Sequence, residues 1–338
     1  MEDFIKYVEI SNFKSIKRLK LDECKRINLF VGYPNVGKSN IIEALSLFSL
    51  PFLSERENLN KLIRVEYKNE LLHNLLESFC SVETNIEKIE LSISSSLKIY
   101  RELANGKADY YLSKELELFN RKIECYDCGS EEYCADGGNV MRYVFQPENQ
   151  WKSTGDNFLL PPFGENIIDV LSHNPNVSVV KEWIKQEFAK FGLEYVIDKA
   201  SNSLRVQRRL NDGEVLQLPY SSIADTLQRI IFYKTAIASN ENSVLLFEEP
   251  EAHAFPPYIR MLTYDIAESK SNQFFIATHS PIIVNEFIED AEICKELAIY
   301  IVNFKDNQTV VRRLTDSDLN DIFERGIDLF FDLERYLD

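Results

Sequence analysis

Short apolar runs that end in polar clusters organise the chain. The run Ile27–Val31 precedes a turn that contains two glycines, and a helical pattern begins after that turn at Asn40. Two later runs, Val244–Phe247 and Gln273–Ala277, flank a helical pattern over Pro257–Glu268. Short apolar strands that alternate with helices are typical of a parallel sheet whose two faces are both covered. The pattern therefore predicts an α/β fold.

Outside these runs, the pattern predicts strands and helices in separate stretches. Alternating apolar and polar residues predict two short strands within Phe4–Leu21, and residues 88–145 have the same β pattern, with a strand at Met141–Phe145. Leucines near helical spacing predict that residues 52–85 are largely helical. The remaining predictions are helices over Asn40–Leu50 (ending at Pro51), 166–171, 177–191 and 224–239, hairpins over Tyr195–Leu218 and 298–314, and a helical tail over Asp316–Asp338.

The predicted elements divide a single domain of 338 residues into four segments. These are an N-terminal lobe with the glycine turn (1–51), a helical and β insertion (52–215), a lobe with the later apolar runs (216–314) and an acidic tail (315–338). In the tail, the residues expected to pack inward from a solvated helix pair are Ile322, Phe323, Ile327, Leu329, Phe330 and Leu333.

The glycine turn, Gly32–Ser39, has the spacing G-x-x-x-x-G-K-S. Its glycines permit backbone conformations in which successive N–H groups point at one phosphate, and the positive end of the following helix dipole lies at the same place. The lysine of such a turn reaches the outer phosphates, and the hydroxyl residue ligates Mg²⁺. The sequence thus predicts a site for ATP and Mg²⁺, contacted by Gly32, Asn35, Val36, Gly37, Lys38, Ser39 and Asn40.

Polar residues also follow the two later apolar runs. Glu248–Glu251 comes directly after the first, and Thr278–Ser280, which includes His279, comes after the second. The carboxyl end of a strand is where a doubly wound sheet places its ligand groups. One acid there can reach the Mg²⁺ shell, while a neighbouring carboxylate orients the attacking water. An acidic loop after a core strand is common, but here three such strand ends come in the expected chain order.

At this point the sequence resembles a known family, the ABC-type ATPases related to RecF, SMC and OLD (overcoming lysogenization defect) proteins. It is most similar to the compact bacterial ATPases of the AAA-15/AAA-21 type, many of which are found in phage-defence operons. The resemblance extends from Phe4 to about Leu314. The motifs that carry it are Asn12–Ser15, the glycine turn, Glu248–His253 and Thr278–Ser280.

The resemblance implies a P-loop NTPase fold with ABC-ATPase-like architecture. Such a fold has a mixed or parallel central sheet, an antiparallel β subdomain and a helical insert. The roles that the resemblance implies are Lys38 on the β- and γ-phosphates, Ser39 and Glu248 on Mg²⁺, Glu249 as general base, His279 as the γ-phosphate sensor, and Lys14 or Phe13 beside the base or ribose. These catalytic and metal-binding roles are expectations at this stage.

The resemblance further implies a head-to-tail homodimer in which a signature segment of one protomer caps the ATP of the other. The segment that matches best is Tyr220–Arg229, which lacks the usual glycine. Ser221 or Ser222 either caps the following helix or offers a hydroxyl to phosphate. The Q-loop glutamine of such proteins is not obvious here, and Gln146, after the strand Met141–Phe145, is a weak candidate.

The net charge of the chain limits the classes of molecule that it is expected to bind. The formal net charge is −16, from 54 acidic and 38 basic residues, so the overall field disfavours nucleic acid. The one basic cluster, which is either an ordinary sheet rim or a DNA-facing patch, contains Lys14, Lys17, Arg18, Lys20, Lys25 and Arg26.

The same inspection predicts a cytoplasmic location. No apolar run approaches the length of a membrane-spanning helix, and the N-terminus lacks a secretory pattern. The six cysteines are therefore expected to be reduced thiols. Cys125, Cys128 and Cys134 have part of a zinc-ribbon spacing, but four ligands are not completed, so loop thiols are the favoured interpretation.

These observations lead to one favoured function and two alternatives. The segment after His279 is too short for the TOPRIM nuclease of OLD proteins, and no heptad region predicts a coiled-coil arm. The favoured function is an ATPase that switches a separate effector, a nuclease or other toxin, in anti-phage defence. The alternatives are a DNA-binding clamp in recombination or repair, and a non-hydrolysing module in which ATP only supports an interaction.

Overall fold

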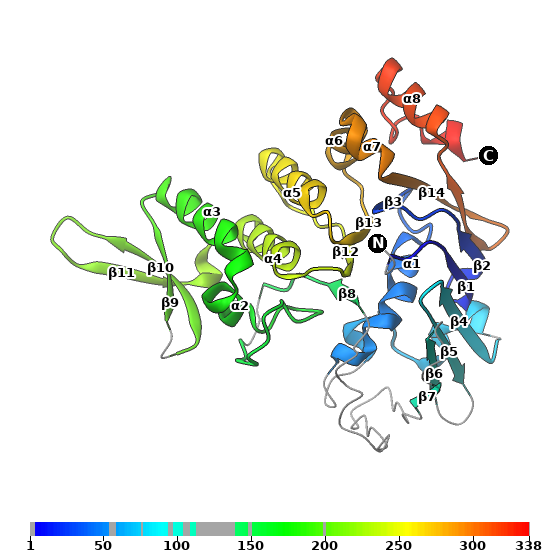
Figure 1. Cartoon of the computed structure of the whole chain (residues 1–338), viewed down its shortest axis with the longest axis horizontal. Coiled ribbons are helices and arrows are strands. Elements are labelled where there is room, and N and C mark those ends of the chain that lie inside the picture. Colours follow the sequence, from blue (N-terminus) through cyan, green and yellow to red (C-terminus); the bar gives the residue numbers. More distant parts are fainter. Residues whose placement is uncertain are drawn as a thin grey trace. The chain divides into compact units, whose positions relative to one another are not determined.

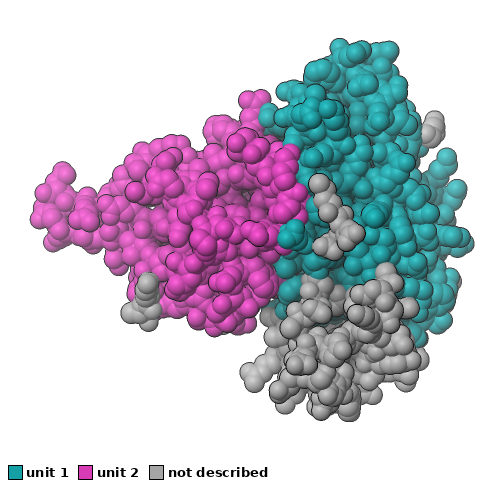
Figure 2. Space-filling view, in the orientation of Figure 1, with its two compact units in different colours: residues 1–142, 242–249, 273–338 teal, residues 143–241, 250–272 magenta. Residues whose placement is uncertain are grey.

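The computed structural model describes residues 4–53, 59–75, 77–93, 97–103, 109–112, 139–147, 151–198 and 201–337. The chain forms two compact units, shown in teal and magenta in Figure 2. Unit 1 comprises residues 1–142, 242–249 and 273–338, and unit 2 comprises residues 143–241 and 250–272. The segments 52–215 and 216–314 therefore each contribute to both units.

A mixed six-stranded sheet is the centre of unit 1. In spatial order its strands are β15 (Gln308–Arg313), β14 (Leu297–Lys305), β3 (Ile27–Val31), β13 (Gln273–Ala277), β12 (Val244–Glu248) and β8 (Val140–Tyr143). The strands β14, β3, β13 and β12 pair in parallel, and β15 returns antiparallel to β14. Because β3 and β13 are buried along their whole length, they appear in the sequence as mostly apolar runs. Their polar residues, Asn28 and Gln273, are buried and hydrogen-bonded.

The second sheet of unit 1 is antiparallel. Its order is β2 (Ile16–Leu21), β1 (Val8–Phe13), β4 (Phe79–Thr84), β5 (Glu87–Ile93), β6 (Leu97–Leu103) and β7 (Asp109–Leu112). Buried residues alternate with partly exposed ones along β4 and β5, as expected when one face of a sheet meets the core. The helix α1 (Lys38–Leu45) contacts β1 of this sheet and β12 and β13 of the central sheet, so the two sheets share one apolar core.

The C-terminal part of unit 1 adds three helices. They are α6 (Pro281–Glu289), α7 (Ala291–Lys295) and α8 (Asp316–Arg325), drawn in orange to red in Figure 1. Thr315 caps α8 in a capping box with Asp318, and Gly326 ends the helix in the left-handed conformation. The tail buries Ile322, Leu329 and Leu333, but Phe323 is 56% exposed, so the prediction that Phe323 packs inward was wrong.

Unit 2 combines helices with a small sheet. Its helices are α2 (Ile167–His173), α3 (Ser178–Ala189), α4 (Asp225–Ser239) and α5 (Pro256–Glu268), and α4 packs against the other three. The antiparallel sheet has the order β11 (Val215–Pro219), β10 (Ser203–Arg209) and β9 (Glu194–Asp198). The predicted hairpin is confirmed and forms part of this three-stranded sheet (Figure 1).

Residues 52–85 differ from the prediction of a largely helical segment. Within the described part they form three 3₁₀ turns, at Leu59–Lys61, Lys68–Leu71 and His73–Leu75, followed by β4. Leu59, Leu62, Leu71 and Leu72 are buried, whereas Leu75 is 60% exposed. The backbone bonds to a distant turn: the Lys14 N–H donates to the Leu71 carbonyl at 3.0 Å. Tertiary contacts therefore replace helical bonds in this segment.

The helix after the glycine turn is also shorter than predicted. It ends at Leu45 and continues as a 3₁₀ helix, Ser46–Phe52, that contains Pro51. The Ser46 hydroxyl donates to the Glu43 carbonyl at 2.6 Å, and such a side-chain bond competes with the α-helical pattern. Within the described residues, further 3₁₀ turns are Pro175–Val177, Tyr220–Ser222 and Leu333–Tyr336.

Neither a membrane span nor a metal cluster is seen in the described ranges. No described helix is long and apolar enough to cross a membrane. Among the described residues, no group of three or more His, Cys, Asp or Glu side chains could hold a metal ion. Cys125, Cys128 and Cys134 lie outside the described residues, so the interpretation of their spacing stays a prediction.

Candidate functional site

The glycine turn closes around the side chain of Lys38. The Lys38 ammonium donates to the carbonyls of Gly32 at 2.9 Å and Tyr33 at 2.8 Å, which lie at the opposite end of the turn. Asn35 has φ 63° and Gly37 has φ 104°, so the backbone reverses twice within three residues. The turn therefore gathers a buried cation and the N-terminus of α1, whose first turn carries no acidic residue. This set of donors fits an anionic phosphate group.

Burial disfavours the charged form of the Lys38 side chain. Desolvation lowers the pKa of Lys38 from 10.5 to about 8, although Glu249 and Glu248 act in the opposite direction. A buried cation next to two carboxylates is stabilised further by a bound polyanion. The lysine is thus in an environment where negative charge from a ligand is favourable.

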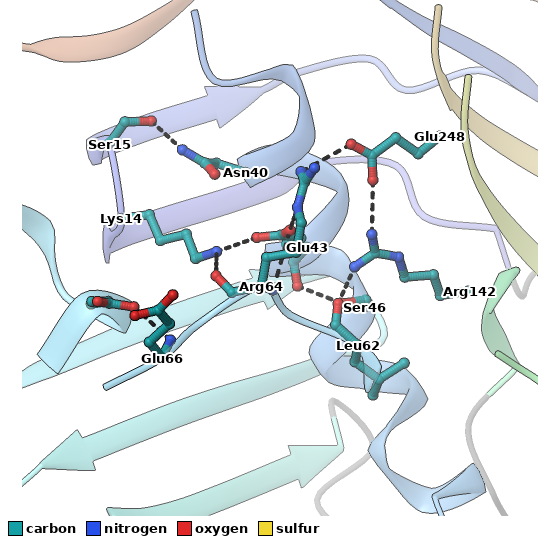
Figure 3. Close-up of polar contacts among 11 residues, drawn as sticks. Lys14, Ser15, Asn40, Glu43, Ser46, Leu62, Arg64, Glu66, Arg142 and Glu248 are labelled. Carbon is teal, nitrogen blue, oxygen red and sulfur yellow. Dashed lines mark hydrogen bonds and ion pairs between the residues drawn. The ribbon is translucent and has the colours of Figure 1, made fainter. Parts of the chain in front are cut away.

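Glu248 ends β12 with both carboxylate oxygens engaged. Its Oε1 accepts from the Arg64 guanidinium at 3.0 Å, and its Oε2 accepts from the Arg142 guanidinium at 2.8 Å (Figure 3). Arg142 comes from β8 and is 5% exposed, whereas Arg64 is 65% exposed. Arg142 also donates to the Leu62 carbonyl, so it is held from two sides. The two arginines fix the direction of the Glu248 carboxylate.

Glu249 follows Glu248 and has an uncommon backbone conformation. Its φ is 44°, in the left-handed region, and its N–H donates to the Ala277 carbonyl at 2.8 Å. A non-glycine residue in this region is typical of functional sites. The Glu249 carboxylate is 49% exposed and lies 3.5 Å from His279 Nε2. Burial and the charge of Lys38 lower the pKa of His279, so the imidazole is neutral at pH 7.

The structure brings four of the predicted catalytic residues to one edge of the central sheet. Lys38 follows β3, Glu248 and Glu249 end β12, and His279 follows β13. These strands are parallel neighbours, so their carboxyl ends meet at the same edge. The predicted metal ligand Ser39 is half-buried at the second position of α1.

Lys14 belongs to a chain of charges next to this edge. Its ammonium donates to Glu43 and to the Arg64 carbonyl, the latter at 2.7 Å (Figure 3). Glu43 is fully buried and also accepts from Arg64 Nε at 2.7 Å. Through Arg64, the chain reaches Glu248. The placement of Lys14 beside a base or ribose stays a prediction, and the structure adds an ionic role for the same ammonium.

Two other predicted nucleotide contacts differ in their surroundings. Asn40 is half-buried and donates from its side-chain amide to the Ser15 hydroxyl at 2.6 Å. Ser222 is exposed at the end of a 3₁₀ turn in unit 2. The residue that caps α4 is Ala224, without a side-chain cap bond, so the alternative in which Ser221 or Ser222 caps that helix was wrong. The phosphate contact of Ser222 stays a prediction.

Sequence reasoning missed several residues of this site. Arg64, Arg142 and Glu43 contact Glu248 or Lys14 directly, and Thr309 contacts the glycine turn. None belongs to a motif. A buried Glu within an apolar helix pattern, as at Glu43, is the one local signal that could have indicated an ion pair.

The chain is similar in sequence to RecF proteins and to an ATP/GTP phosphatase. No protein-family model matches the chain. The DNA replication and repair protein RecF of Clostridium kluyveri is 25% identical over 255 residues, which cover 71% of this chain and 64% of that protein. An ATP/GTP phosphatase of Helicobacter pylori is 21% identical over 377 aligned positions, covering 96% of this chain and 100% of that protein. The chain spans 23%, 50% and 64% of the length of three RecF relatives, from Caldanaerobacter subterraneus, Leptospira interrogans and C. kluyveri.

Solved structures are similar over nearly the whole chain. An Smc head domain with an extended coiled coil, derived from Pyrococcus furiosus and bound to the C-terminal domain of ScpA, has a TM-score of 0.53 at 14% identity. It covers 96% of this chain and 99% of its own. An SMC head bound to the C-winged helix domain of ScpA has a TM-score of 0.52 at 17% identity and covers 93% and 99%. At these identities the likeness shows the fold.

The sheets and the glycine turn have the fold of a P-loop ATPase. Within this class the chain is RecF- and SMC-head-like. The predicted fold class, with its mixed central sheet and antiparallel subdomain, is confirmed.

Proposed function

We propose that this chain binds ATP with Mg²⁺, hydrolyses it within a head-to-tail homodimer, and uses the cycle to switch a separate effector protein. The observation that carries the catalytic part is the meeting of Lys38, Glu248, Glu249 and His279 at the carboxyl edge of three parallel strands. A phosphate-binding turn and two carboxylates at one edge of the sheet, one to hold a metal ion and one to act on water, are the parts that phosphoryl transfer to water needs.

Each residue has a role that follows from its surroundings. Lys38 and the N–H groups of the glycine turn would hold the phosphates, and Ser39 with Glu248 would hold Mg²⁺. Each Glu248 carboxylate oxygen accepts from one arginine and keeps a second lone pair for the metal ion. When bound, the metal ion neutralises charge that develops on the transferred phosphoryl group. Glu249, half-exposed beside the site, would accept the proton of the attacking water on a carboxylate oxygen. The neutral imidazole of His279 can donate a hydrogen bond without adding charge.

The homodimer supplies what one protomer lacks. The segment Tyr220–Arg229 belongs to unit 2, and in the proposal it completes the site of the partner. Support comes from the SMC-head fold and from the resemblance to ATPases that close around ATP. The switching of an effector in anti-phage defence is supported by the resemblance to the AAA-15/AAA-21-type proteins.

The RecF relatives favour a second candidate, a clamp that grips duplex DNA when ATP closes the dimer. Most of the basic residues in the cluster predicted for that role form ion pairs with acidic residues of the same chain. The four paired residues are Lys14 with Glu43, Lys20 with Glu9 and Asp22, Lys25 with Asp316, and Arg26 with Glu296. Charges neutralised in this way release few counterions from DNA, so the clamp is less favoured than the effector switch.

The test is ATP turnover as a function of protein concentration, together with sizing in ATP and Mg²⁺. A specific activity that rises with concentration, and a dimer that appears only with nucleotide, are expected. ATP binding without turnover at any concentration would leave the non-hydrolysing module. Absence of ATP binding would end all three functions. Salt-sensitive DNA binding that requires ATP would instead favour the clamp.

The affinity for ATP is expected to fall as the pH rises above about 8, the pKa to which burial lowers Lys38. Below that pH the ammonium is already formed, so the affinity changes little. Above it, binding of the polyanion must first restore the proton, and the affinity falls by up to about tenfold per pH unit. Titration calorimetry on both sides of this pKa measures the effect. Lys38→Arg keeps its charge throughout and should flatten the profile, whereas a flat wild-type profile contradicts the assignment.

A further inference from the structure

A series of hydrogen bonds connects Asn40 through the hydroxyl groups of Ser15 and Thr309 to the backbone of the glycine turn, and we call this series the relay. The Asn40 side-chain amide contacts the Ser15 hydroxyl at 2.6 Å, and the Ser15 hydroxyl contacts the Thr309 hydroxyl at 2.6 Å. The Thr309 hydroxyl contacts the Val36 carbonyl, within the glycine turn, at 2.8 Å. Figure 3 shows the first of these contacts, with Ser15 and Asn40 facing each other. The relay joins residues up to 294 positions apart.

The donors in this relay have only one consistent direction. A carbonyl oxygen can only accept, so Thr309 must give its single hydroxyl hydrogen to Val36. Ser15 must then donate to Thr309, and its own oxygen accepts from the Asn40 amide. Hydrogen bonds aligned in one direction polarise one another, so each link strengthens the next. Loss of the Thr309 hydroxyl removes the bond to the turn, and loss of the Ser15 hydroxyl removes the group that donates to Thr309 and accepts from Asn40.

The glycines of the turn pack against the same hairpin that supplies Thr309. A Cβ added to Gly37 would lie 2.0 Å from Thr309 Oγ1, and one added to Gly32 would lie 2.3 Å from the Val302 carbonyl oxygen. Val302 is in β14 and Thr309 is in β15. The Thr309 N–H also donates to the Ser15 carbonyl at 2.8 Å. The β14–β15 hairpin thus packs against the glycine turn. Its residue Thr309 is fully buried and donates a hydrogen bond to the Val36 carbonyl of the turn.

We propose that Ser15 and Thr309 are positioning residues that hold the glycine turn in its nucleotide-binding shape. The inference rests on the proposed ATP site, because its purpose is to set the direction of the backbone N–H groups there. It also gives a second role to the Asn12–Ser15 motif, whose serine acts on the turn rather than on the nucleotide. Asn40 acts through Ser15.

Thr309→Val is the test, because valine keeps the shape of threonine and removes the hydroxyl. Without nucleotide, the variant is expected to speed hydrogen exchange in residues 32–40 relative to the rest of the chain. With Mg²⁺, its affinity for ATP is expected to fall about tenfold, the usual effect of one buried hydrogen bond that positions a ligand site. Thr309→Ser retains the hydroxyl and should restore both readouts. The double variant Ser15→Ala with Thr309→Val should change hydrogen exchange and ATP affinity little more than the more affected single variant does. Both substitutions interrupt the same series of hydrogen bonds.

Thr235→Val is the matched control. Thr235 is also fully buried and donates one hydroxyl bond, to the Ile231 carbonyl at 2.7 Å, within α4 of unit 2. It should lower the melting temperature to a similar extent while leaving exchange in the turn and the affinity for ATP unchanged. Equal exchange in wild type and Thr309→Val would overturn the inference. The exchange readout needs no ATP, so a failure of the wild-type protein to bind ATP would refute the proposed function and leave this test standing.

Discussion

Glu249→Gln is expected to reduce ATP turnover by about 100- to 10,000-fold, the range in which a general base contributes. Glutamine has the same shape but cannot take a proton from water. The backbone of residue 249 is set by a hydrogen bond from its N–H to the Ala277 carbonyl, which the substitution leaves in place. Binding of ATP should therefore persist while the chemical step is lost. In the proposed cycle the homodimer then stays closed, and sizing in ATP and Mg²⁺ should show a dimer that does not decay.

Glu268→Gln is a suitable control for this experiment. Glu268 is an exposed acid at the end of α5 in unit 2 and is not one of the candidate site residues, so its substitution makes the same chemical change outside that set. Turnover and sizing should match those of wild type. If Glu249→Gln hydrolyses ATP at the wild-type rate, the general base is another group. If neither protein hydrolyses ATP although both bind it, the chain acts as a binding module.

The elements that position this site were largely predictable from the sequence. The runs Ile27–Val31, Val244–Phe247 and Gln273–Ala277 became β3, β12 and β13 because fully buried parallel strands need continuous apolar residues. The glycine turn between β3 and α1 was predictable because its backbone conformation and its lysine are specified locally. For the same reason, the sequence indicated which strand ends would meet.

The supporting contacts could not be predicted, because their partners are distant in the chain. Arg142 reaches Glu248 across 106 positions, and Ser15 reaches Thr309 across 294. The apolar spacing in residues 52–85 indicated burial for most of the described leucines, although Leu75 is exposed. It did not indicate the backbone conformation, since buried leucines occur in 3₁₀ turns as well as in helices. Side-chain partners and irregular segments are set by the tertiary fold.

Glu43→Met is expected to lower the free energy of unfolding by about 3–5 kcal/mol, the usual cost of removing one member of a buried ion pair. Glu43 is fully buried and accepts a hydrogen bond from the Lys14 ammonium, and the Lys14 side chain is 12% exposed. The substitution leaves that ammonium buried without its carboxylate. Lys14→Met combined with Glu43→Met removes both charges and should recover much of the loss. Chemical denaturation of the single and double variants measures the difference, and Glu9→Gln, at the exposed pair with Lys20, should change little.

The pH dependence of Glu43→Met separates this explanation from simple loss of packing. Burial already lowers the pKa of Lys14 below 10.5, and Glu43 raises it in part, so the variant should lower that pKa further. Between the lowered pKa of the folded state and the ordinary pKa of the unfolded state, the unfolded chain binds more protons. Stability therefore rises with pH in that window. The deficit of Glu43→Met should shrink as the pH approaches 10.5, the ordinary pKa of lysine. A deficit that is independent of pH, or a double variant as unstable as the single one, would show that the lost stability comes from packing rather than from the uncompensated Lys14 ammonium.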